Sequence, residues 1–222
     1  GNENRGYQFP AVNWGTGVVN LDSWNITGLT NWWAAFYLPS SNFNIDIGNW
    51  DMSNAHNLAV MFAFNTHFNN GGSPSISGWD VSNVRSMRQM FDGASSFNQP
   101  IGSWNVTNAG YGMYGGNGFQ YMFRNATSFN QDISSWDISN ANSLNYMFDG
   151  ATAFQQNIGS WDVSNITGPQ WAFMSNKQYP TANYDNLLIG WSSQNVQNGV
   201  YLSFGTSKYS VGAAASARAT LV

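Results

Sequence analysis

The sequence predicts an α/β solenoid of about six 25-residue coils, with a parallel sheet on one side, short helices on the other and a C-terminal cap. Three features predict this fold class. Tryptophans recur along the chain, an alternating apolar stretch surrounds each one, and apolar residues then follow at three- and four-residue spacing. Hydrophobic residues make up 42% of the chain and aromatic residues 16%, which is enough for a continuous core. We expect one structural domain, with an N-terminal cap over 1–20, the solenoid over 21–191 and a C-terminal cap over 192–222.

The repeat is defined by seven tryptophans: Trp24, Trp50, Trp79, Trp104, Trp136, Trp161 and Trp191. Their successive spacings are 26, 29, 25, 32, 25 and 30 residues, so two coils have the basic length and the others carry insertions. The two coils without insertions, 78–102 and 135–159, align without a gap and agree at most apolar positions. A period of this length is typical of proteins whose units stack on their neighbours to build one core.

The hydrophobic period changes within each coil. Around each tryptophan, apolar and polar residues alternate, as at Trp79 and Val81, and this alternation predicts a short strand. Downstream, the spacing of Met87, Met90 and Phe91 predicts a short helix. A serine or threonine stands before every predicted helix, where its hydroxyl could accept from first-turn amides: Thr27, Ser53, Ser82, Thr107, Ser139 and Ser164.

A second aromatic residue closes each coil, at Phe43, Phe68, Phe97, Phe129, Phe154 and Tyr184. Stacking at the spacing of parallel strands, ~4.8 Å, would align the Trp, Phe and Ile positions into ladders. An asparagine row follows the predicted strands, and we expect it to bond backbone groups of adjacent coils: Asn54, Asn83, Asn108, Asn140 and Asn165. Together these elements predict a leucine-rich-repeat-like architecture.

The repeated pattern I-x-x-W-D-V-S-N-V-x-x-M-x-x-M-F-x-G-A-x-x-F-N-Q resembles the repeat of the BspA-like bacterial surface proteins, which are abundant among mycoplasma lipoproteins and secreted bacterial proteins. The resemblance covers residues 21–191, and the segment 184–222 resembles the C-terminal cap of such proteins. It implies a leucine-rich-repeat-like fold, a location outside a cell or on its surface, and a role in adhesion or ligand binding. It does not imply an enzyme.

The charge and the side-chain inventory argue against several functions. Charged residues make up only 8% of the chain and the net charge is -4, so a phosphate-neutralising surface for nucleic acid is not expected. Cysteine is absent, Glu3 is the single glutamate, and the two histidines, His56 and His67, lack metal-ligand spacing. We therefore expect no cofactor, no metal site and no enzymatic activity. No apolar run in this chain is long enough to span a membrane.

The residue after each tryptophan should point out of the predicted sheet, which makes Asp51, Asp80, Asn105, Asp137 and Asp162 candidate ligand-binding residues. Neighbouring carboxylates repel each other, so a cation or sugar hydroxyls could stabilise this row. Alternatively, each side chain bonds nearby amides where the strand turns into the helix. Calcium sites use about six or more oxygen ligands, which favours the second interpretation.

The longest insertion, 110–118, interrupts the repeat with glycines and tyrosines. Tyr111 and Tyr114 are candidate contacts to a protein or a glycan, because exposed tyrosines on a loop suit recognition. The alternative is that they pack on neighbouring coils. A second insertion, 69–75, has the composition of a plain linker.

Three functions remain. The first is an extracellular or cell-surface adhesion module that recognises a protein or a glycan. The second is a structural subunit that assembles with copies of itself, motivated by the apolar chain end at 219–222 and by repeat edges that invite pairing. The third and weakest is binding to ice or a mineral surface through the regular Ser/Thr and Asp/Asn rows.

Overall fold

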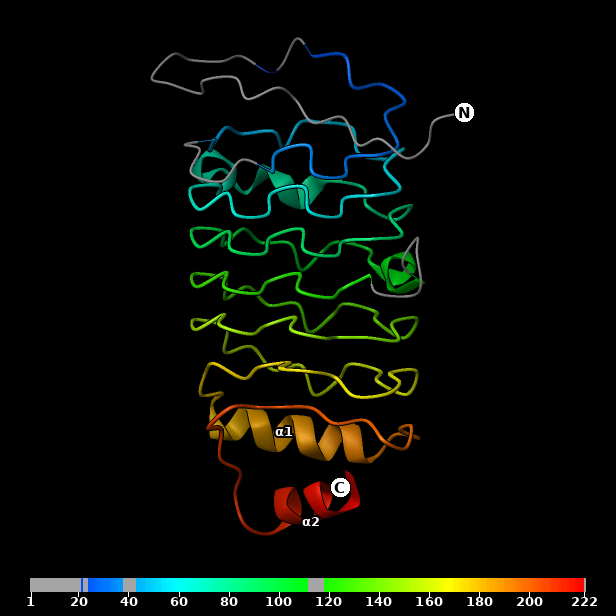
Figure 1. The fold of residues 1–222 in the computed structure, drawn as a ribbon, viewed down its shortest axis with the longest axis vertical. Coiled ribbons are helices and arrows are strands. Elements are labelled where there is room, and N and C mark those ends of the chain that lie inside the picture. The colour runs from blue at the N-terminus through cyan, green and yellow to red at the C-terminus, as the bar shows by residue number, and fades with distance from the viewer. Residues whose placement is uncertain (1–20, 22–23, 38–42, 112–117, 222) are drawn as a thin grey trace.

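The computed structural model describes residues 21, 24–37, 43–111 and 118–221. Successive windings of the chain lie one above another in a tall stack, from the N-terminal windings at one end to the two long helices at the other (Figure 1). One hydrophobic core runs through these windings, from Leu21 to Ala217. The predicted N-terminal cap, 1–20, lies outside the described residues.

The predicted parallel sheet with helices on its other side is not formed, so the leucine-rich-repeat-like fold class is wrong. Across the described ranges, β-pairing is limited to three isolated parallel bridges: Asn31 with Asn57, Asn57 with Ser86, and Gln170 with Leu202. The helices there are the 3-10 turns η1 (Asn70–Gly72), η2 (Pro74–Gly78) and η3 (Thr107–Tyr111), and the α-helices α1 (Thr181–Ser192) and α2 (Ala213–Leu221). None of them covers 84–94 or 141–151, where helices were predicted.

Overlapping turns replace the predicted helices. The Gln89 amide donates to the Gln120 carbonyl of the next winding at 2.9 Å, whereas the Met90 amide donates back to the Met87 carbonyl at 3.1 Å. Neighbouring amides thus alternate between a distant and a local partner. Gln89 has a φ of 57°, which the third residue of a type II turn requires. Because these local bonds close over three residues, inward positions recur at an interval close to that of a helix.

The predicted strands are absent for a related reason. The Trp79 amide donates to the Ile76 carbonyl of its own winding at 3.2 Å, and the Val84 amide donates to the Val81 carbonyl at 2.9 Å. Both bonds close local turns, so these groups do not form a ladder between windings. The predicted Ser/Thr helix caps are also wrong, because only Thr107 begins a helix, the 3-10 turn η3.

The tryptophans nevertheless join the windings. The Trp104 indole Nε1 donates to the Ile76 carbonyl of the preceding winding at 3.0 Å, and that same carbonyl accepts the Trp79 amide. The arrangement recurs at Trp79, Trp136, Trp161 and Trp191, with indole-to-carbonyl distances of 3.0–3.3 Å. Each isoleucine carbonyl therefore accepts one donor from its own winding and one from the next.

Phenylalanine rings stack in two parallel columns inside the windings. In one column, Phe62, Phe91, Phe123 and Phe148 have centroids 5.6–5.8 Å apart. In the other, Phe68, Phe97, Phe129 and Phe154 are 5.9–6.0 Å apart, as the ladder prediction implied. Tyr184 does not continue the second column, and that assignment is wrong: Tyr184 belongs to α1, and its ring lies 4.7 Å from that of Phe204.

Four of the five members of the predicted asparagine row, all except Asn54, link adjacent windings, which confirms the predicted role at these four positions. The Nδ2 atoms of Asn83, Asn108, Asn140 and Asn165 donate to backbone carbonyls of the preceding winding at 2.7–3.1 Å. Gln197 extends the row by donating to the Ser164 carbonyl at 2.9 Å. Neutral amides thus connect the windings from one end of the described stack towards the other.

The insertion 69–75 is an ordered polar cluster, so its interpretation as a plain linker is wrong. Asn70 is fully buried, its Oδ1 accepts the Ile47 amide at 2.9 Å, and its Nδ2 donates to Asp46 and Ser75 at 3.1 Å. The Ser75 hydroxyl also donates to Asp46 at 2.6 Å. These bonds hold η1 and η2 against the preceding winding, which carries Asp46 and Ile47.

Candidate functional site

The predicted aspartate row is exposed, and each member closes a local turn. The Oδ1 atoms of Asp51, Asp80, Asp137 and Asp162 accept the amide of the serine two residues later at 2.9–3.0 Å, and Asn105 accepts the Thr107 amide at 3.3 Å. Bonds from the serine hydroxyl and amide lower the pKa of Asp51, Asp80 and Asp137. The described residues contain no group of three His, Cys, Asp or Glu side chains that could hold a metal ion. The row therefore makes the turn bonds of the second interpretation, and binding of a ligand by these side chains stays a prediction.

The two tyrosines predicted in the longest insertion are not placed by the structure. Tyr114 lies outside the described residues, and Tyr111 is described only as the last residue of η3. Their proposed role in recognition stays a prediction.

A surface that the sequence did not indicate lies on the outward side of the overlapping turns. We call it the tyrosine–arginine face and define it by Arg88, Tyr121, Arg124, Tyr146 and Trp171. Tyr121 and Tyr146 occupy the same position in adjacent windings, and their rings stack with centroids 4.8 Å apart and planes 7° apart. Both rings are half-buried, so each keeps part of its surface in water.

Two arginines flank the tyrosine stack. The guanidinium of Arg124 lies 4.6 Å from the ring centroid of Tyr121, and that of Arg88 lies 5.8 Å from it. Contacts of this kind are favourable because the face of an aromatic ring is electron-rich. Arg88 is exposed, and the one ion pair among the described residues belongs to Arg124, so the charge of Arg88 is available to a ligand.

Arg124 is held rigidly by a carboxylate in the core. Its Nε and one terminal nitrogen bond the two oxygens of Asp92 at 2.9 and 2.6 Å, and the Asp92 side chain has no exposed surface. Gln89 donates a further bond to Asp92 at 3.2 Å. The hydrogen bond to Asp92 is the main cause that raises the pKa of Arg124. This bidentate geometry fixes the guanidinium against the ring before any ligand arrives.

The next winding completes the face with polar and aromatic groups. Asp149 accepts a bond from Asn176 at 2.7 Å, and Asn145 accepts the backbone amide of Trp171. The side chain of Trp171 is 63% exposed, an unusual state for so large an apolar group. The face therefore offers ring surfaces, a free cation and amide groups within a few windings.

Sequence reasoning missed this face because it sought binding residues beside the tryptophans and in the longest insertion, and not on the outward positions of the predicted helices. In the turns, the residues before the Met-Phe pairs of two adjacent windings, Tyr121 and Tyr146, lie on the same outward side and stack. The repeated letters Y-M-F at 121–123 and 146–148 were the signal available in the sequence.

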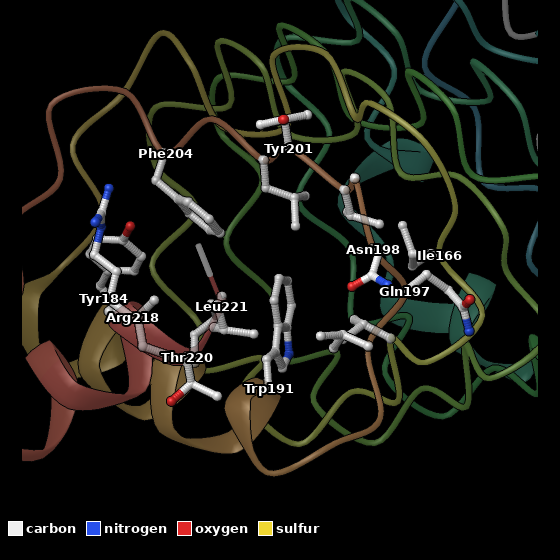
Figure 2. Close-up of a pocket in the computed structure, with 17 residues that line it drawn as sticks. Ile166, Tyr184, Trp191, Gln197, Asn198, Tyr201, Phe204, Arg218, Thr220 and Leu221 are labelled. Atoms are coloured by element: carbon white, nitrogen blue, oxygen red, sulfur yellow. The ribbon is translucent and has the colours of Figure 1, made fainter.

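A cavity of about 410 Å³ lies at the C-terminal end of the stack (Figure 2). It is bounded by α1, by α2 and by the segment 196–204, with Trp191, Phe204 and Leu221 on its walls. Gln197 and Thr220 supply polar groups at its edges.

No helix among the described residues combines the length and apolar character needed to cross a membrane.

Comparison with known proteins identifies the repeat. The family model described as "Mycoplasma protein of unknown function, DUF285" matches residues 8–115, 76–187 and 116–210, and these overlapping matches together span most of the chain. The chain matches no curated protein and no solved structure. The chain therefore belongs to the DUF285 family of Mycoplasma proteins of unknown function.

Proposed function

We propose that this protein is a binding module of a cell surface or the extracellular space, and that it holds a glycan or a protein through the tyrosine–arginine face. The observation that carries the proposal is the stack of Tyr121 on Tyr146, flanked by Arg88 and by the fixed Arg124. Tyrosine, tryptophan and arginine are the side chains that most often dominate recognition surfaces.

The state of these side chains supports a binding role. Arg124 is held by Asp92, and the two tyrosine rings are held by each other, so little side-chain freedom is lost when a ligand docks. Tyr121 and Tyr146 combine an apolar ring with a hydroxyl, which suits partners that carry both C–H surfaces and hydroxyl groups. A face built only to support the fold would not need an exposed tryptophan such as Trp171.

The location outside a cell is proposed on the resemblance of the repeat to that of the BspA-like surface proteins. The Trp, Met-Phe, Gly-Ala and Phe-Asn-Gln positions that carry this resemblance fill the core and the ladders. These positions therefore indicate a relationship to the family and do not identify a ligand. The ligand must be sought on the outward positions, which vary between windings.

A binding array tests the proposal directly. Wild-type protein, the Tyr146→Ala variant and the Tyr209→Ala variant are applied to immobilised glycans and extracellular-matrix proteins. Tyr209 is a matched control, because it is also an exposed tyrosine beside an arginine, with Arg218 5.5 Å from its ring, but it lies near the C-terminal end. We expect at least one ligand to be lost with Tyr146→Ala and kept with Tyr209→Ala. Equal binding by all three proteins would contradict the proposal.

Assembly with copies of the same chain is a second candidate. It is favoured by exposed apolar side chains near one end of the stack, where Trp171, Tyr201 and Val211 are 63%, 73% and 95% exposed. Sedimentation of the purified protein over a range of concentrations tests it, and a monomer at every concentration would exclude it. Ice binding gains no support, because hydroxyls such as those of Ser103 and Thr152 donate to carbonyls of the preceding winding.

A further inference from the structure

The outward aromatic column stops after Tyr146. The position that carries Tyr121 and Tyr146 in two windings is Ala172 in the next one, where the Tyr146 amide bonds the Trp171 carbonyl at 2.9 Å. All three residues share the left-handed backbone, with φ of 58°, 56° and 49°. Tyr121 is the single ring among the described residues that stacks on Tyr146. No second ring of the described residues therefore stacks on Tyr146, and the equivalent position of the next winding, beside the exposed Trp171, carries only the methyl group of Ala172.

Positive charge gathers at the other end of this face. Arg88 and Arg124 are two of the seven Lys and Arg residues of a chain whose net charge is -4. Asp92 neutralises Arg124, whereas Arg88 is exposed and outside the one ion pair of the described residues. Arg88 therefore offers an unneutralised positive charge to an anion at this end of the face, whereas Asp149 adds a carboxylate near Arg124.

From these two observations we infer that the tyrosine–arginine face binds a linear acidic glycan that runs along the stack. The inference rests on the proposed function and specifies its ligand class. One sugar ring packs its C–H face on Tyr146 above Ala172, next to Trp171, and a carboxylate or sulfate group further along the chain reaches Arg88. The ligand must be extended, because the winding of Tyr121 lies between Arg88 and Tyr146.

The shape of the face favours a glycan over an acidic peptide. A protein partner usually inserts an apolar anchor into a pocket. The cavity at the C-terminal end is bounded by α1 and α2, away from Tyr121 and Tyr146. Amide side chains lie in the same or adjacent windings as the rings: Gln120 donates to the Ser143 hydroxyl at 3.1 Å, and Asn176 donates to Asp149. Amides beside flat rings suit the alternating hydroxyls and C–H faces of a sugar.

The test uses the full chain and four soluble probes: hyaluronan, heparin, neutral dextran and polyglutamate. Binding is measured by titration calorimetry with wild type, Tyr146→Ala, Arg88→Gln and Ala172→Tyr. Ala172→Tyr is the decisive variant, because Tyr121 and Tyr146 show that tyrosine accepts this backbone, and the new ring would cover the free side of Tyr146. Tyr209→Ala and Lys208→Gln are matched controls, since both residues are exposed and lie near the C-terminal end.

We expect hyaluronan or heparin to bind wild type and dextran to bind far less. Each of the three face variants should weaken binding about tenfold, and the two controls should leave it unchanged. Thermal unfolding of each variant separates loss of the site from loss of the fold. Polyglutamate binding as strong as glycan binding, with no effect of Tyr146→Ala, would mean simple charge attraction and overturn the inference.

The remaining outcomes separate this inference from the proposed function. If a matrix protein binds in the array and depends on Tyr146, while no acidic glycan binds, the face is a protein site and the glycan inference fails alone. If dextran binds as well as hyaluronan, the requirement for an anion fails. If neither glycans nor proteins bind, the proposed function fails too.

Discussion

Lys177 is a cation enclosed in the core. Only 7% of its surface is exposed, its Nζ donates to the Phe154 carbonyl, and it lies 5.2 Å from the Phe154 ring and 5.6 Å from the Tyr179 ring. Burial lowers its pKa from 10.5 to about 8. The neighbouring Tyr179 and the more distant Tyr184 have raised pKa values, also because of burial. The core thus favours the neutral forms of both residue types.

These shifts predict the pH dependence of stability. Between about pH 8 and the 10.5 of the unfolded lysine, the unfolded chain binds more protons at Lys177 than the folded chain, so stability rises with pH. We expect a gain of about 3 kcal/mol across the window, opposed above about pH 10 by ionisation of the tyrosines in the unfolded chain. Urea unfolding at a series of pH values measures it. The Lys177→Met variant should lose the rise, and an unchanged slope would show that Lys177 is not its source.

The pair of Asp92 and Arg124 predicts an asymmetric response to mutation. Arg124→Ala leaves a wholly buried carboxylate without its partner and should destabilise the fold by about 3 kcal/mol, a moderate value because Arg124 is partly exposed. The double variant Asp92→Asn with Arg124→Gln removes both charges and should recover part of the loss. Unfolding free energies from denaturant titration check both values. Equal destabilisation by the single and double variants would contradict this account.

At the scale of the elements, the sequence predicted which residues stack but not the backbone that carries them. The Trp, Phe and Asn positions were identified correctly because burial and laddering depend mainly on the repeat length. Secondary structure was wrong because turns that close over three residues imitate helical spacing. The left-handed residues Val60, Gln89 and Tyr146 gave no warning, since none is glycine. The tyrosine–arginine face was missed for another reason, because binding residues were sought beside the tryptophans and in the longest insertion.

The left-handed position at Val60 predicts a stabilising substitution. Val60 has a φ of 64°, which is unfavourable for a β-branched residue, whereas asparagine tolerates this conformation. Val60→Asn should raise the free energy of unfolding by about 0.5–1 kcal/mol. Val196→Asn is the control, because Val196 is also half-buried but lies outside the left-handed region. A loss of stability at both positions would show that relief of strain does not outweigh lost burial.

The indole contacts between windings predict a second stability effect. Trp104→Phe keeps an aromatic ring but removes the bond from Nε1 to the Ile76 carbonyl. We expect a loss of about 1–2 kcal/mol, since Ile76 retains the Trp79 amide and only one of its two donors disappears. Trp33→Phe, at a residue 43% exposed, should change stability little. Differential scanning calorimetry of the two variants decides whether the indole bonds matter.

At the scale of the whole molecule, neutral groups hold the stack together. Aromatic columns fill the interior, amide and hydroxyl side chains bond the windings, and one ion pair joins two of the described windings. Charged residues make up only 8% of the chain. Added sodium chloride, from about 0.05 to about 0.5 M, should therefore shift the unfolding temperature by no more than about 2 °C. A larger fall would show that surface charges contribute more than these contacts indicate.

Each isoleucine carbonyl accepts the indole of the next winding in the same way. Every winding that carries both groups therefore donates to the winding before it and accepts from the winding after it through equivalent contacts. A tandem duplication or an in-frame deletion of one unit, such as 78–102, would rejoin matching surfaces without creating a new kind of interface. Gene-level recombination could thus lengthen or shorten the rod by whole units. The outward side chains, which the ladders do not use, would remain free to diversify copy by copy.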